Sequence, residues 1–207
     1  MAKSVRQAPP PASAVRTRRA YFDCRFGQLH VRTAFPATGG FDEQVPLFCV
    51  HPSSASSRVF GAFLASIADR RSIYAPDLPG FGESDAPAAG ALGAGAAAIQ
   101  DLASDLRLRR IDVLAFADGC GVALDLCSAA PELVRRLVLV GAGGIDRLAS
   151  IATPCLVLRI GADAKARAVD PPAHVEIASA PEYGEDLFEA APQAVAKACA
   201  AFLDRGA

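Results

Sequence analysis

The sequence predicts an α/β fold in which a mostly parallel central sheet is flanked by helices on both faces. From Ala20 onward, strand-like and helix-like segments alternate along the chain, which is the pattern of that class. Of the 207 residues, 52% are hydrophobic and 21% are charged, a composition sufficient for one substantial core. The sequence contains no internal repeat. We therefore expect one domain over residues 20–207.

The predicted strands are short, and the first two form a hairpin around Gly27. In chain order they are residues 21–26, 28–33, 46–50, 72–75, 111–116, 136–140, 154–160 and 174–178. Helices are predicted where apolar residues recur at intervals of three and four, because that spacing gives one face that packs on the sheet. These faces consist of Phe60, Phe63, Leu64 and Ile67; of Ile99, Leu102, Ala103 and Leu106; and of Val195, Ala198, Cys199 and Phe202. A further helix follows the strand at 111–116.

Two segments are expected to lack stable structure. Residues 1–19 contain five basic residues, the run Pro9-Pro10-Pro11 and no acid, which is typical of a disordered basic tail. Residues 88–98 are all Ala or Gly except Leu92 and are expected to be mobile.

Charge and composition exclude several classes of partner. The formal net charge of −1 gives no broad electrostatic reason to expect nucleic acid or an anionic membrane, and no apolar run approaches membrane-spanning length. The six cysteines lack Cys-x-x-Cys spacing and are interpreted as reduced, mostly buried thiols. We expect a soluble, cytoplasmic protein without a cofactor or metal, whose partner is a small molecule or another protein.

A sharp turn from strand to helix is predicted directly after residues 111–116, where small residues precede a helical pattern. Ala117 lies at the tip of this turn, with Ala115 two positions before it and Gly119 two positions after it. Alanine has no lone pair to attack with and no proton for a base to remove. A covalent mechanism is therefore closed at this position.

Three further segments, taken with this turn, resemble the α/β-hydrolase family from about residue 21 to the C-terminus. Residues 50–54 look like the family's oxyanion loop, and residues 77–84 look like its Asp-x-Pro-Gly-x-Gly-x-Ser signature, which is highly specific. Residues 131–140 are similar to its helix end and following strand. The resemblance implies that Ala117 occupies the nucleophile position of the Gly-x-Ser-x-Gly elbow, and the spacing back from residue 131 gives the same register.

Asp118 and Cys120 are the neighbouring candidates for a nucleophile. Each would place a bulky residue, Phe116 or Val122 respectively, two positions from the tip of a strained turn that needs a small one. We interpret Asp118 as a solvated acid favoured by the helix dipole. Cys120 is interpreted as a packing residue.

The resemblance implies that the remaining triad positions have changed as well. Asp163 follows the strand at 154–160 and holds the acid position, while Glu185 holds the histidine position by its spacing to Pro192. No histidine follows His174, which we place at the surface, at the opposite edge of the sheet. Asp163 and Glu185 could form a pair in which one pKa is raised. The alternative, that they point apart into solvent, is the one we favour.

The resembling oxyanion loop supplies the other candidate site residues. Backbone N–H groups of Ser53 and Asp118 are expected to remain as oxyanion donors, because they do not depend on the lost side chains. His51 is expected to orient this loop and, with Ser54, to contribute to binding. His30, in the predicted hairpin, is interpreted as structural.

Only residues 142–153 separate two of the predicted strands, which is about the minimum for a parallel crossover, so no lid is expected there. The first functional hypothesis is a hydrolase-fold protein that has lost triad chemistry and binds a small molecule or a protein. The alternative is an active hydrolase or lyase that uses Asp163, Glu185 or Ser53. A third possibility, a nucleophile supplied by another chain, has no support in the sequence.

Overall fold

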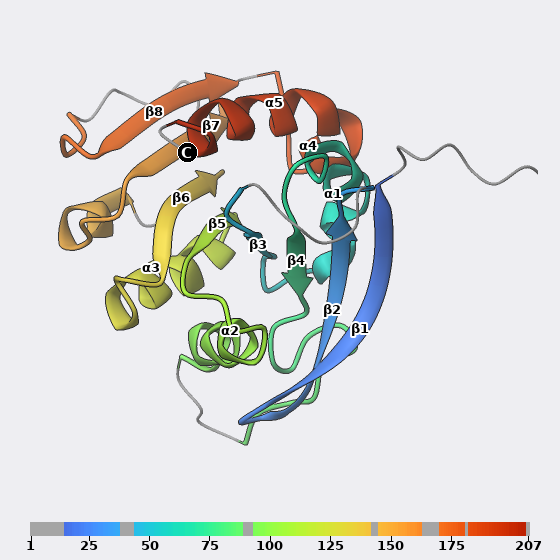
Figure 1. The fold of residues 1–207 in the computed structure, drawn as a ribbon. Coiled ribbons are helices and arrows are strands. Elements are labelled where there is room, and N and C mark those ends of the chain that lie inside the picture. The colour runs from blue at the N-terminus through green and yellow to red at the C-terminus, as the bar shows by residue number, and fades with distance from the viewer. Residues whose placement is uncertain are drawn as a thin grey trace, which may run out of the picture.

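The structure is a computed structural model of the chain, and it describes residues 15–37, 44–88, 93–141, 145–162, 170–180 and 182–205. Its centre is an eight-stranded sheet with the order β1-β2-β4-β3-β5-β6-β7-β8 (Figure 1). The strands are β1 (Arg16–Cys24), β2 (Gly27–Phe35), β3 (Leu47–Val50), β4 (Ile73–Pro76), β5 (Ile111–Phe116), β6 (Val134–Val140), β7 (Cys155–Ile160) and β8 (Val175–Ala180).

The sheet is parallel from β4 to β8, while β2 pairs antiparallel with β1 on one side and with β4 on the other. The chain passes from β3 to β4 on one side and then returns to place β5 on the other side of β3. Ligands of open α/β sheets bind beyond the carboxyl ends of the strands at such a reversal. The predicted fold class is confirmed, and the topology directs attention to the residues that follow β3 and β5.

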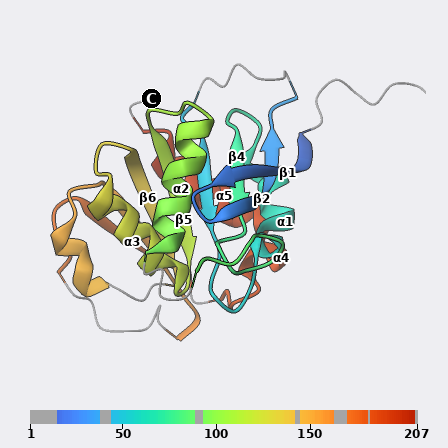
Figure 2. The ribbon, with the colours of Figure 1, turned by 90° about the horizontal axis from the view of Figure 1, so that it is seen from below.

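Helices cover both faces of the sheet. On one face lie α1 (Gly61–Ile67), α4 (Leu187–Ala190) and α5 (Pro192–Leu203), and on the other lie α2 (Ala94–Asp105) and α3 (Gly119–Ala129) (Figures 1 and 2). Two short 3₁₀ helices, η1 (Ser57–Phe60) and η2 (Ile145–Ser150), lie in the connections. Each face has its own apolar core, with Ile99 and Leu102 of α2 in one and Phe63 and Val195 in the other.

Two expectations about order need correction. β1 begins at Arg16, so residues 16–19 belong to the sheet rather than to a tail; residues 1–14 lie outside the described part. The expected mobile stretch 88–98 is also partly wrong, because α2 begins at Ala94. Alanine favours helix, and the small residues allow close packing on α3: a Cβ at Gly95 would come within 2.9 Å of Val122 Cγ1.

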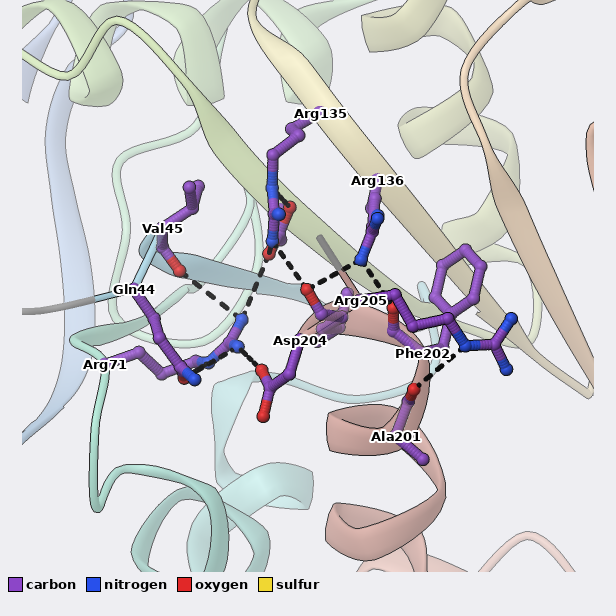
Figure 3. A network of polar contacts seen from close by, with 11 residues as sticks. Gln44, Val45, Arg71, Arg135, Arg136, Ala201, Phe202, Asp204 and Arg205 are labelled. Atoms are coloured by element: carbon purple, nitrogen blue, oxygen red, sulfur yellow. Dashed lines mark hydrogen bonds and ion pairs between the residues drawn. The ribbon is translucent and has the colours of Figure 1, made fainter. Parts of the chain in front are cut away.

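A buried ion network lies where β5 begins, at the edge of the sheet away from the carboxyl ends (Figure 3). The Asp112 side chain is fully buried, and it accepts hydrogen bonds from Arg71 Nη1 at 3.0 Å and Arg135 Nη2 at 2.6 Å. Arg135 and Arg136 also donate to the backbone carbonyl of Leu203, at 2.7 and 2.9 Å. Because the last carbonyls of a helix have no partner within the helix, these arginines attach the end of α5 to the sheet.

Candidate functional site

The turn between β5 and α3 has the strained backbone predicted for a nucleophile elbow. Ala117 has a φ of +49°, in the left-handed region that costs a residue with a Cβ roughly 1–2 kcal/mol. Its N–H donates to the Val140 carbonyl at 2.9 Å. A Cβ on Gly119 would lie 2.5 Å from the His51 carbonyl oxygen, which explains why a small residue is needed there. The bend therefore presents a methyl group at its tip.

Ala117 and Glu185 line the same cavity, of about 220 Å³, at the carboxyl edge of the sheet. The cavity is mostly bounded by small and apolar residues: Phe116, Gly141, Ile160, Gly161, Ala162 and Gly184. Asp163 lies outside the described residues. Sequence spacing thus led to two positions, Ala117 and Glu185, that the fold brings to one hollow.

The wall beside the bend is fixed by aromatic packing. Phe116 is buried, and its ring meets that of Phe188 edge-on, with centroids 5.2 Å apart. Phe188 in turn contacts Phe60 and Phe63 in the same manner. The bend therefore rests on a rigid apolar cluster.

His51 is fully buried and joins the two loops that resemble family motifs. Its Nε2 accepts the Leu78 N–H at 2.9 Å, so the ring proton lies on Nδ1, which donates to the Pro52 carbonyl at 2.8 Å. Burial lowers the pKa of this imidazole, although the bond to Pro52 opposes the shift. Both ring nitrogens are occupied by backbone groups, so His51 positions the loops and has no nitrogen free for a reacting proton.

The other two histidines are also held by partners outside the cavity. His30 Nδ1 lies 2.9 Å from Asp77 Oδ2, and both side chains are buried. Burial acts to raise the pKa of Asp77, but hydrogen bonds from Ser57, Glu83 and His30 outweigh it and hold that pKa below its ordinary value. His174, expected at the surface, is half-buried, and its Nε2 lies 3.2 Å from the Leu148 carbonyl. None of the three histidines lines the Ala117 cavity.

Asp118 differs from the sequence interpretation. Its side chain is not simply solvated: the Ser53 N–H donates to Oδ1 at 2.9 Å, and the Ser53 hydroxyl donates to Oδ2. Partial burial acts to raise the pKa of Asp118, but these bonds and the backbone N–H groups of Asp118 and Gly119 outweigh it and lower the pKa. The backbone N–H of Ser53, which the family resemblance predicts to bind an oxyanion, therefore donates its hydrogen bond to an ionised carboxylate of the chain itself.

The two remaining candidates are simpler. Ser54 is exposed, and within the described ranges no polar contact of its side chain is recorded. Cys120 is buried, with its thiol 3.5 Å from the Ala115 carbonyl. Burial raises the pKa of Cys120 to about 12, so it packs as a thiol and does not supply a thiolate.

The fold and the elbow define the class of this protein, and sequence comparison agrees. The α/β hydrolase family matches residues 47–207, and the chain belongs to that family. Among curated proteins, an uncharacterized protein of Mycobacterium tuberculosis is 32% identical over 165 residues, which is 79% of this chain and 45% of that protein. The chain thus spans less than half the length of that relative. A 2-hydroxymuconate semialdehyde hydrolase of Pseudomonas sp. is 32% identical over 109 residues, or 49% of this chain and 38% of that enzyme.

Solved structures of the same fold lie at low sequence identity. The carboxylesterase CesB from Bacillus subtilis has a TM-score of 0.77 and 16% identity, covering 93% of each chain. Cfl2 from Burkholderia cenocepacia has a TM-score of 0.74 and 18% identity, covering 94% of this chain and 98% of that one. At such identity the likeness establishes the fold alone. Within the ranges that the structure describes, no helix combines the length and apolarity needed to cross a membrane.

Proposed function

We propose that this chain has lost the triad chemistry of its family and binds a small molecule or a protein partner at the cavity beside Ala117. The observation that carries the proposal is the methyl group of Ala117 at the tip of the elbow. In addition, the nearby Ser53 N–H already donates its hydrogen bond to Asp118. Acyl transfer by this fold needs a nucleophile, a base and free oxyanion donors. Here alanine stands at the nucleophile position, Glu185 stands at the position of the histidine base, and the Ser53 N–H is bonded to Asp118.

The same losses in a serine hydrolase indicate how much activity such changes remove. In subtilisin, loss of the nucleophile lowers kcat about a million-fold and leaves roughly a thousand-fold acceleration over water. Part of that remaining acceleration comes from the oxyanion donors, since loss of one donor lowers kcat by about 10²–10³-fold. Here the Ser53 N–H is bonded to a carboxylate that would also repel a developing negative charge. We expect wild-type turnover of esters to be close to background.

The proposal is tested with a fluorophosphonate probe and an aryl-ester assay. Wild type should neither label nor turn over at ordinary enzyme rates, while Ala117→Ser combined with Glu185→His should gain both. The matched control makes the same two changes away from the cavity, as Ala129→Ser with Glu189→His, because both positions are exposed. Labelling of wild type at a stoichiometry near one would contradict the proposal.

A second candidate, an active enzyme with non-standard residues, is favoured by one contact. The Ser53 hydroxyl donates to Asp118, which is the geometry of a nucleophile beside a base. The lowered pKa of Asp118 makes it a weak base, so we rank this candidate second. It predicts that Ser53→Ala or Glu185→Gln abolishes a measured turnover, and unchanged activity in both variants would remove it.

The cysteines support a reducing compartment, and we propose the cytoplasm. All six are free thiols, and five of them are buried. Buried thiols in strands and helices behave as small apolar residues and need no oxidising environment. Localisation of a tagged full-length protein by cell fractionation tests this directly.

A further inference from the structure

Two arginines face each other across the β1–β2 hairpin. The antiparallel register pairs Arg19 directly with Arg32. Side chains that are directly opposite in such a ladder share one face, with Cβ atoms about 4.5–5.5 Å apart, and like charges in this position are destabilising. An unrelieved pair of guanidiniums would therefore be a cost to the hairpin.

Neither arginine is neutralised by a carboxylate in the part of the chain that the structure describes. Other arginines of the chain do form ion pairs with acids, namely Arg25, Arg58, Arg71, Arg135, Arg147 and Arg205. By contrast, Arg32 Nε is buried and has no acceptor. A buried N–H without a partner is destabilising, which indicates that an acceptor belongs there.

A hollow of about 190 Å³ lies beside this pair. It is lined by Thr17, Arg18, Arg19, Arg32 and Thr33 of the hairpin and by Gly61 and Leu64 of α1. A Cβ at Gly61 would meet nothing within 4 Å, so this side of the hollow is open. A water molecule takes about 30 Å³ in the liquid. The hollow therefore has room for a tetrahedral anion and part of the group that carries it.

We propose that this hollow, which we call the hairpin site, binds the dianionic phosphate group of a small molecule. Guanidinium groups match phosphate oxygens with paired N–H donors, and two of them match a charge of −2. Thr17, which also lines the hollow, carries a hydroxyl group that can donate a further hydrogen bond. Phosphate would supply the missing acceptor for Arg32 and remove the repulsion from Arg19. The site shares no lining residue with the Ala117 cavity, so it stands independently of the proposed function.

Calorimetric titration at low ionic strength tests the hairpin site with three probes: phenyl phosphate, inorganic phosphate and benzenesulfonate. We expect saturable one-to-one binding of the phosphates and at least tenfold weaker binding of the monoanionic sulfonate. Tighter binding of phenyl phosphate than of inorganic phosphate identifies an organic monoester as the ligand. Equal binding identifies the free anion.

Arg19→Gln and Arg32→Gln should each weaken phosphate binding at least tenfold. The matched control, Arg109→Gln, removes the same charge from an exposed arginine outside the hollow and should bind within twofold of wild type. Without phosphate, Arg19→Gln should melt at the wild-type temperature or above it, because it relieves the repulsion; this separates loss of binding from loss of folding. Absence of saturable binding in wild type, or equal losses in Arg32→Gln and Arg109→Gln, would overturn the proposal.

Discussion

Once a serine nucleophile has been introduced at position 117, removal of the Asp118 carboxylate is expected to raise the esterase activity of the variant. In the variant Ala117→Ser with Glu185→His, a serine would stand at the bend and an imidazole at the position given by spacing. The Ser53 N–H would still donate to Asp118 at 2.9 Å and would not be free for the substrate. Asp118→Ala in this background frees that donor and removes a negative charge beside it.

The size of the gain follows from what one oxyanion donor contributes. Loss of a single donor lowers kcat by about 10²–10³-fold, so release of Ser53 should raise kcat by about 100-fold. KM should change less, because the donor acts mainly on the charge that develops in the transition state. The assay is steady-state hydrolysis of an aryl ester by the double and the triple variant.

The control for this experiment is Asp105→Ala in the same double-variant background, because Asp105 is an exposed acid at the end of α2. It should leave kcat unchanged. If the triple variant is no faster than a measurably active double variant, the Asp118 carboxylate does not block an oxyanion donor.

Three further predictions concern pH and stability. The lowered pKa of Asp118 means that its contacts stabilise the fold above the pKa of the unfolded chain, near 3.8, and that this contribution is lost as pH falls through the lower folded-state pKa. Thermal melts between about pH 2 and 5 should therefore show a weaker pH dependence in Asp118→Asn than in wild type. Asp112→Ala leaves two guanidiniums without their buried acceptor and should cost about 3–5 kcal/mol in urea unfolding, whereas Asp69→Ala at an exposed site should change little. Gly119→Ala should destabilise by about 1–3 kcal/mol through its clash with a backbone carbonyl, while Gly121→Ala, with open space around its Cβ, should stabilise α3 by up to about 1 kcal/mol in the same assay.

Local sequence patterns predicted the fold class and two positions that line the cavity. Ala117 is fixed by the run of small residues after a buried strand, and Glu185 by its distance to the proline that begins α5. The Ser53–Asp118 contact was missed because these residues are separated by 65 positions and meet only when β3 and β5 pair. One signal was available in the sequence: Asp118 is an acid next to the bend, and the Ser53 N–H of the loop 50–54 was expected to point toward the same bend.

The strained backbone of Ala117 is explained by architecture and does not require retained chemistry. Its N–H bonds to Val140 on β6, and the close approach of Gly119 to the His51 carbonyl sets where α3 begins. A different φ at Ala117 would change the direction in which α3 leaves β5 and disturb the close approach of Gly119 to the His51 carbonyl, so the fold maintains the bend whatever side chain stands at its tip. An elbow geometry is therefore evidence for the family and not for catalysis. The same bend places Asp118 beside Ser53. The Ser53 N–H, which in an active site would bind the oxyanion, here binds the Asp118 carboxylate.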